Sequence, residues 1–253
     1  MVEITTTDGV TRLYRDIILD NPDDLFFCNI LDRIGPDTMT GVRGVEPLYS
    51  LFKSIQYLVQ NDIPGDFVEC GVWRGGSITL MALSLLHFGD TSRKIYLYDT
   101  FLGMTQPEER DVNWDGNRSL TEWEKINSVE IADNETRVMG YGGSIEEVRE
   151  RVFTTNYPKD KFVFVKGPVE ETIPATVPEH IAMLRLDTDW YASTYHEFVH
   201  LYPLLGAGGV IIVDDYGWCR GAREATDQYI KENKLDLFLN RVDESVRIGI
   251  KRI

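Results

Sequence analysis

Four aspartates stand directly after two apolar runs, in a pattern that can hold a metal ion. Asp187 and Asp189 follow one run, and Asp214 and Asp215 follow the other. Ligands of open α/β sheets bind beyond the carboxyl ends of the strands, and neighbouring strands lie about 4.8 Å apart. If the two runs are neighbouring strands, three of these carboxylates face one point, where they repel one another and raise one another's pKa. A hard divalent cation such as Mg²⁺ relieves that repulsion, so the pattern favours a magnesium site. Capping of the following helices or loops is the alternative role for Asp189 and Asp215.

A second pattern is a glycine-rich turn with an acidic residue in front of it. In the segment VECGVWRGGS, Glu69 precedes Gly71, and Ser77 opens the next predicted helix. Glycines allow a ligand to approach the backbone closely, and the start of a helix offers unpaired N–H groups. The spacing differs from G-x-G-x-x-G, and Glu69 would repel a pyrophosphate but suits the positively charged methionine end of S-adenosylmethionine (SAM). We therefore predict that Glu69, Gly71 and Ser77 bind SAM; a turn that only packs a helix on a strand is the alternative.

Two further polar residues are candidates for cofactor binding. Asp99 ends the next apolar run, where an acidic side chain can accept two hydrogen bonds from a ribose diol. Both nicotinamide-binding and SAM-binding folds use an acid at this place, so Asp99 indicates an adenosine ligand without identifying the cofactor, and helix capping is its alternative role. Ser144 has Glu147 three residues later, the spacing of a helix capping box, and we place it as another cofactor contact.

The elements that would position these residues alternate between short apolar runs and longer amphipathic segments. This alternation predicts an α/β fold with a mostly parallel sheet and helices on both faces. The C-terminal segment predicts an antiparallel hairpin, with strands at 235–239 and 246–251 around a polar turn. The other expected strands are 66–70, 94–98, 162–166, 181–186 and 209–213, and the expected helices are 77–88, one opening at 144, 193–204 and 223–233.

The chain divides into two predicted regions. Residues 1–63 form a helical cap, because their one strong pattern is the helical spacing of apolar residues between Leu48 and Leu58, and residues 64–253 form the core of a single domain. Within the core, Gly103–Gly143 is polar and has no clean period over some forty residues. Long irregular segments are often lids or binding loops, so we predict that this segment and the cap cover the substrate. A surface insertion without a ligand role is the alternative.

Composition excludes several classes of partner. The 253-residue chain is 43% hydrophobic and carries a net charge of −15, which repels nucleic acid and anionic membranes. The first ten residues are unlike a signal peptide, and no apolar run has the length of a transmembrane helix. Its three cysteines are widely spaced and fit neither a disulfide framework nor a zinc site. We therefore expect a cytoplasmic protein with a small-molecule partner; a homo-oligomer is compatible with the sequence.

Four segments together carry a resemblance to a known family. They are PGDFVECGVWRGGS, YDTF, MLRLDTDWYAST and LYPLLGAGGVIIVDDYGWCRGAREATDQY, in this order between Pro64 and Tyr229. With them the chain resembles the TylF/macrocin O-methyltransferase family of antibiotic-sugar methyltransferases. The resemblance implies a class I SAM-methyltransferase (Rossmann-like) fold, dependence on Mg²⁺, and metal ligation by Asp187, Asp214 and Asp215.

The same resemblance implies a substrate and more of the site. Family members methylate hydroxyls of deoxysugars on natural products, which suggests a glycosylated acceptor and a step of antibiotic biosynthesis. A shorter similarity, DTMTGVRG, implies that Thr38 and Met39 lie over the cofactor. The chain departs from the common MDGD form in having LDTD, so the general base stays open between Asp187, the first candidate, and Asp189.

Rival functions remain at this point. The Asp187-Thr188-Asp189 sequence also fits the D-x-D motif of a metal-dependent glycosyltransferase, although the glycine turn and the Asp214-Asp215 pair fit that enzyme badly. A non-catalytic SAM-binding protein would bind the cofactor without depending on a metal. A nicotinamide dehydrogenase fits least, because neither a pyrophosphate-type turn nor a catalytic Tyr-x-x-x-Lys motif is visible.

Overall fold

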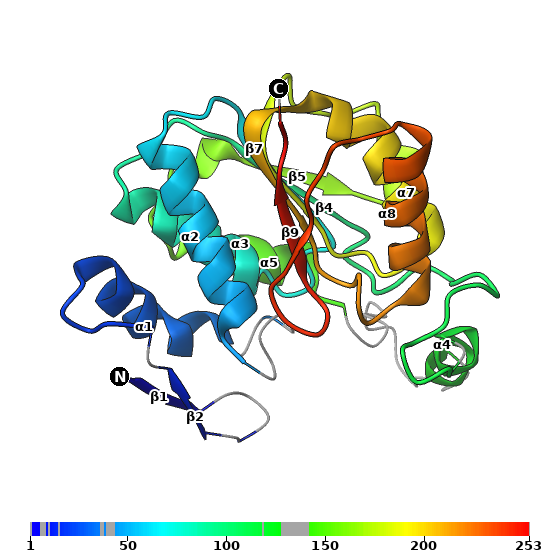
Figure 1. Cartoon of the computed structure of the whole chain (residues 1–253), viewed down its shortest axis with the longest axis horizontal. Coiled ribbons are helices and arrows are strands. Elements are labelled where there is room, and N and C mark those ends of the chain that lie inside the picture. Colours follow the sequence, from blue (N-terminus) through cyan, green and yellow to red (C-terminus); the bar gives the residue numbers. More distant parts are fainter. Residues whose placement is uncertain are drawn as a thin grey trace.

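The described residues form a seven-stranded sheet in a computed structural model that covers residues 2–5, 9, 11–14, 16–35, 38, 44–117, 119–127 and 142–252 (Figure 1). The strand order is β5-β4-β3-β6-β7-β9-β8, parallel from β5 to β7 and antiparallel at β9 and β8. This is the α/β fold that the sequence predicts, with a mostly parallel sheet. The strands are β3 (Asp66–Cys70), β4 (Ile95–Asp99), β5 (Phe162–Lys166), β6 (Ile181–Leu186), β7 (Leu205–Val213), β8 (Asn240–Arg241) and β9 (Arg247–Ile250).

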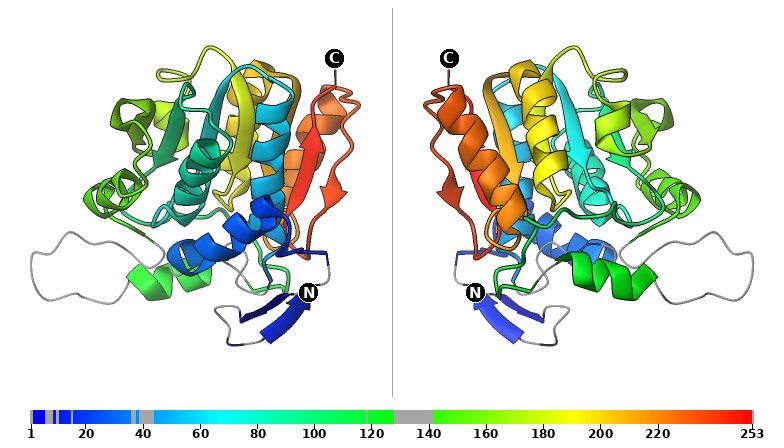
Figure 2. Two further views of the ribbon diagram at one scale, coloured as in Figure 1. Left: turned by 90° about the vertical axis from the view of Figure 1, so that its left-hand side faces the viewer. Right: turned by 90° about the vertical axis from the view of Figure 1, so that its right-hand side faces the viewer.

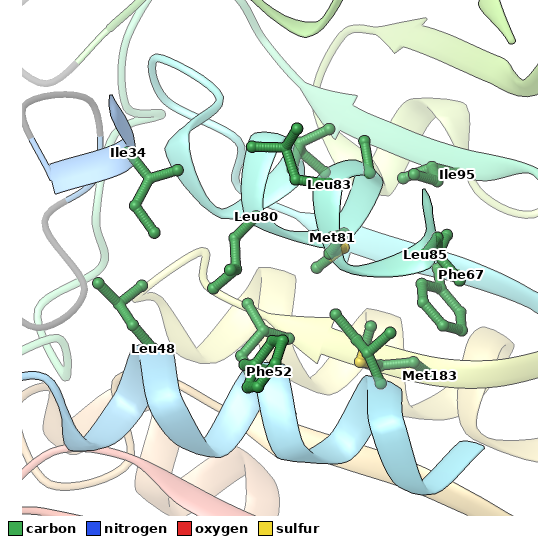
Figure 3. Close-up of a cluster of buried hydrophobic side chains, with 14 of the residues drawn as sticks. Ile34, Leu48, Phe52, Phe67, Leu80, Met81, Leu83, Leu85, Ile95 and Met183 are labelled. Carbon is green, nitrogen blue, oxygen red and sulfur yellow. The ribbon is translucent and has the colours of Figure 1, made fainter. Parts of the chain in front are cut away.

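Helices cover both faces of this sheet (Figure 1). On one face lie α2 (Glu46–Gln60), α3 (Gly76–His87) and α5 (Ile145–Phe153), and on the other lie α6 (Val169–Thr172), α7 (Tyr191–Leu201) and α8 (Arg220–Glu232). Alternate strand residues point to opposite faces. Thus Phe67 of β3 and Met183 of β6 pack with Phe52 of α2 and Leu80 of α3 (Figure 3). The intervening strand residues form a second core with α7 and α8, and so both faces of the sheet are buried.

The N-terminal region contributes a small hairpin and two helices. Strands β1 (Val2–Thr5) and β2 (Thr11–Tyr14) pair antiparallel, and α1 (Pro22–Ile34) precedes α2. The Asn21 side chain caps α1 by accepting hydrogen bonds from the N–H groups of Asp23 and Asp24. The apolar spacing correctly predicts α2, whereas the sequence analysis identifies neither the hairpin nor α1. Side chains of α1 and α2 belong to the same core as the sheet.

The C-terminal hairpin differs from its prediction in one strand. The strand expected at 246–251 is β9, but the one expected at 235–239 is displaced, because the structure places its partner, β8, at Asn240–Arg241. The alternating Leu235, Leu237 and Leu239 do pack against the second core, which explains the strand-like pattern. Burial of every second side chain therefore occurs here without a strand.

The described part of the chain between β4 and α5 contains one helix. Helix α4 (Ser119–Asn127) lies at the same end of the molecule as the β1–β2 hairpin (Figure 2). Short 3₁₀ turns, Lys159–Lys161 and Tyr202–Leu204, precede β5 and β7. Among the described helices, none is long and apolar enough to cross a membrane.

Candidate active site

The carboxyl ends of the central strands meet beside a large cavity. Strands β3, β6 and β7 are neighbours, and the N–H of Asp187 donates to Cys70 O at 2.8 Å while the N–H of Asp214 donates to Leu186 O at 2.9 Å. A cavity of about 640 Å³ opens at this edge. Its described lining includes Asp99, Asp187, Asp189, Asp214 and Asp215. The topology therefore brings together the acids that lie far apart in the sequence.

Three of these carboxylates form a compact cluster. Asp187, Asp214 and Asp215 each offer an oxygen, and these oxygens lie within 4.8 Å of one another. Burial raises the pKa of all three, that of Asp214 to about 7, and the neighbouring carboxylates add to the rise. The Oδ2 atom of Asp215 is buried and accepts no hydrogen bond from any described residue. An orphaned oxygen among crowded carboxylates is the environment that a hard cation would satisfy.

Arg185 lies behind the cluster as its internal counter-ion. Its side chain is 1% exposed and bonds to Glu69, to Asp187 Oδ2 at 2.7 Å and to Asp214 Oδ1 at 2.9 Å. These ion pairs hold the two aspartates in place and lower their pKa, against the rise caused by burial. One guanidinium has three carboxylates as partners, so a single positive charge does not balance the site.

Asp189 faces a different neighbour. Its backbone is left-handed, with φ 63°, and its Oδ1 accepts a hydrogen bond from the Cys219 thiol at 3.2 Å. Burial raises the pKa of Asp189 to about 6. Asp189, Asp215 and Cys219 form a second group with metal-ligand spacing, but burial also raises the pKa of the Cys219 thiol, which therefore stays protonated. The all-oxygen set of Asp187, Asp214 and Asp215 is the better match for Mg²⁺.

The glycine turn touches the loop that carries the acids. Gly71 has φ 82°, and a Cβ at this position would overlap the carbonyl oxygen of Asp187. Its N–H donates to Tyr98 O at 2.9 Å. Only glycine combines this backbone angle with so close an approach. The candidate cofactor turn and the carboxylate cluster are therefore parts of one cavity.

Asp99 organises this turn from the end of β4. Its Oδ2 accepts hydrogen bonds from the N–H groups of Val72 at 2.7 Å and Trp73 at 3.0 Å, and its Oδ1 accepts one from Phe101 N–H at 2.6 Å. Burial raises the pKa of Asp99, and these backbone donors oppose the rise. The carboxylate lines the cavity while it braces the turn, so a ribose would share oxygens that already accept hydrogen bonds.

The other predicted cofactor contacts occupy different places. Ser77 and Thr38 line the cavity, whereas Glu69 lies behind Ser77, is fully buried, and accepts the Ser77 hydroxyl hydrogen bond at 2.6 Å. Burial raises the pKa of Glu69 to about 7. Ser144 lies outside the described lining and forms the predicted capping box at the start of α5. Met39 falls outside the residues that the structure describes.

The cavity lining and its supports also contain residues for which the sequence predicted no role in binding or catalysis. All five tryptophans of the chain line the cavity: Trp73, Trp114, Trp123, Trp190 and Trp218. Asp111 is 1% exposed, and its carboxylate accepts hydrogen bonds from Tyr191 N–H at 2.9 Å and Glu108 N–H at 2.8 Å. It thereby attaches the segment after β4 to the start of α7. An aspartate in a polar, aperiodic segment gives no sequence signal of such a role.

The C-terminal hairpin also reaches the site. The Ser245 hydroxyl donates to Asp214 O at 2.7 Å, and the N–H of Gly217 donates to Ser245 O at 2.9 Å. Asp243, Glu244 and Ser245 belong to the cavity lining. The turn between β8 and β9 thus supports the loop that carries Asp214.

Comparison with known proteins gives consistent matches. A sequence model described as macrocin O-methyltransferase (TylF) matches residues 33–248. The demethyldecarbamoylnovobiocin O-methyltransferase of Streptomyces niveus is 32% identical over 192 residues, which are 76% of this chain and 67% of that protein. The 8-demethyl-8-(2,3-dimethoxy-α-L-rhamnosyl)-tetracenomycin-C 4′-O-methyltransferase of Streptomyces olivaceus is 31% identical over 204 residues, 79% of this chain and 71% of that one.

Solved structures agree with these sequence matches. The O-methyltransferase NovP superposes with a TM-score of 0.69 at 28% identity, over 83% of this chain and 81% of that chain. The calicheamicin methyltransferase CalS11 superposes with a TM-score of 0.56 at 17% identity, over 96% and 98%, and supports the fold alone. The mostly parallel sheet is thus shared with structures of methyltransferases.

Proposed function

The chain belongs to the macrocin O-methyltransferase (TylF) family, and on this premise we propose that it moves the methyl group of SAM onto a sugar hydroxyl of a glycosylated small molecule, with Mg²⁺ held by Asp187, Asp214 and Asp215. The observation that carries the proposal is the meeting of these three carboxylates in the same cavity as the Gly71 turn. The raised pKa of the acids and the orphaned oxygen of Asp215 support a cation there.

We assign different roles to the residues of the site. The turn at Gly71, with Asp99 and Ser77, would bind the cofactor, and Glu69 would act from behind Ser77 rather than by contact with the cavity. When bound, Mg²⁺ would lower the pKa of the acceptor hydroxyl, and SAM would supply the methyl group. Positioning of both reactants would supply much of the rate enhancement.

Two aspartates are candidates for taking the hydroxyl proton. Asp187 remains the first, since it stands in the carboxylate cluster, although Arg185 also occupies one of its oxygens. Asp189 is the second; it lines the same cavity, and burial raises its pKa. Substitution of each by asparagine, described in the Discussion, separates them.

A sugar acceptor without a phosphate is supported by two observations. Both relatives named above are O-methyltransferases, and the name of one of them specifies a rhamnosyl compound. In addition, the cavity lining contains many carboxylates, and none of its described residues is a lysine, arginine or histidine. A pyrophosphate in this lining would depend on a bound metal alone for its counter-charge, so the lining favours an uncharged acceptor. We also propose that the protein is located in the cytoplasm.

The proposal is tested by a transfer assay with labelled SAM. Methyl and aryl rhamnosides serve as acceptors with Mg²⁺ present, and thermal melts compare SAM with a UDP-sugar. We expect label in the glycoside and a rise in melting temperature with SAM alone. Stabilisation by the UDP-sugar, without SAM binding, would favour the glycosyltransferase. SAM binding without transfer to any glycoside would favour the non-catalytic SAM-binding protein.

A further inference from the structure

Two tryptophans of the cavity lining lie beside each other, and one of them is on the loop that carries Asp215. Trp218 stands three residues after Asp215, and its N–H donates to Asp215 O at 3.1 Å. The ring of Trp114 lies next to the ring of Trp218, with 5.9 Å between the ring centroids and 53° between the ring planes. Both side chains line the cavity. The two indoles therefore form a continuous aromatic part of the lining, next to the loop that carries Asp215.

Trp114 is exposed to an unusual degree for its size. Its exposed fraction is 62%, whereas Trp190 in the same cavity is 8% exposed. The indole N–H groups of Trp190 and Trp123 donate to backbone oxygens of Thr105 and Met104, so these two rings are fixed within the wall. A large indole exposed inside a concave site offers apolar area that a ligand can bury.

Hydrogen bonds fix the backbone of the segment that carries the exposed Trp114 ring. The N–H of Trp114 donates to Trp218 O at 2.9 Å, and Asn113 forms an antiparallel bridge with Cys219. Asp111, two residues earlier than Asn113, attaches the same segment to α7. Because the backbone of this segment is already fixed, less conformational freedom is lost when a ligand stacks on the Trp114 ring.

On the basis of the proposed function, we propose that Trp114 and Trp218 form an aromatic platform for the acceptor, in which Trp114 binds the flat, carbon-rich aglycone. The hydroxyl to be methylated would lie at Asp187, Asp214 and Asp215, so the sugar ring would lie next to Trp218. The group attached to the sugar would then reach Trp114. The platform selects a glycoside over a free sugar, and places methylation after the glycosyl-transfer reaction that attaches the sugar.

The test uses two acceptors that differ only in this group. Methyl α-L-rhamnopyranoside and 2-naphthyl α-L-rhamnopyranoside are titrated calorimetrically into the protein with Mg²⁺ and S-adenosylhomocysteine present. We expect the naphthyl glycoside to bind about ten-fold more tightly to the wild type, the size expected for one well-stacked aromatic contact. Trp114→Ala should abolish this preference, and Trp114→Phe should restore part of it, with the affinity for the methyl glycoside unchanged.

A matched control separates the platform from general loss of surface aromatics. Phe238 is 73% exposed and does not line the cavity, so Phe238→Ala should keep the full preference. Equal binding of the two glycosides to the wild type, no binding of the naphthyl glycoside, or a preference that survives Trp114→Ala would each overturn the platform. A preference that depends on Trp114, without methylation of either glycoside, would support the platform and contradict the proposed reaction on rhamnosides.

Discussion

The two walls of the cavity are built in different ways. On the sheet side, Asp99, Asp187 and Asp214 follow directly from the ends of β4, β6 and β7, so the pairing of strands fixes their positions. On the opposite side, the segment after β4 has little regular structure before α4 and is attached through Asp111 and a few backbone hydrogen bonds. From this difference we infer that the reaction depends on the side chains at the strand ends. The choice of acceptor would depend on the segment between β4 and α4, here called the attached segment.

The largest expected effect is at Asp187, on the sheet side. Asp187→Asn keeps the shape but gives a weaker metal ligand that cannot accept a proton, so turnover should fall about 10²–10⁴-fold. SAM affinity, measured by calorimetry, should change little. Arg185 retains Glu69 and Asp214 as partners, so the fold should persist.

Asp189→Asn is the matched comparison for the general base. Because Asp189 is outside the proposed ligand set, Asp189→Asn should retain metal affinity, and its turnover should fall by a large factor only if Asp189 is the base. If Asp189→Asn produces the larger loss with metal affinity intact, Asp189 replaces Asp187 as the base. Normal turnover in both variants would contradict a catalytic role for either.

The next largest effect is expected on SAM binding, from substitution of Asp99 at the end of β4. Asp99→Ala should weaken SAM binding by about 1–3 kcal/mol, because a buried hydrogen-bond acceptor is lost. The carboxylate also braces the turn at Val72 and Trp73, so the melting temperature should fall as well. Asp99→Asn keeps one acceptor oxygen and serves as the control for the turn. Unchanged SAM affinity in the alanine variant would remove Asp99 from the cofactor site.

A smaller effect on stability and on acceptor affinity is expected when the contact between the attached segment and α7 is removed. Asp111→Ala removes the acceptor for Tyr191 N–H at the start of α7, which should lower the free energy of unfolding by about 1–2 kcal/mol. The apparent affinity for the acceptor should fall, with SAM affinity unchanged. Asp111→Asn, which keeps an acceptor oxygen, should lie between the wild type and the alanine variant. A fall in SAM affinity equal to that for the acceptor would contradict the division between the two walls.

Sequence reasoning succeeded where local pattern and topology coincide. Short apolar runs that end in acids predicted β6 and β7, and parallel neighbours necessarily bring Asp187 and Asp214 to one edge. Contacts between distant parts of the chain decide the rest of the site. Its place before the glycine turn predicts Glu69 as a cofactor contact, which stays a prediction; the structure buries its side chain against Arg185 of the neighbouring strand. Trp114 and Asp111 lie in an aperiodic segment, and only the folded chain shows what they contact.

We propose that methyl transfer requires a divalent cation at Asp187, Asp214 and Asp215. The most direct measurement is turnover of the chelator-treated protein with labelled SAM and a glycoside acceptor, before and after Mg²⁺ is added, with elemental analysis of the same sample. We expect turnover to be lost in the metal-free protein and to return with Mg²⁺. Full turnover in excess chelator, in a sample shown to contain no metal, would contradict it.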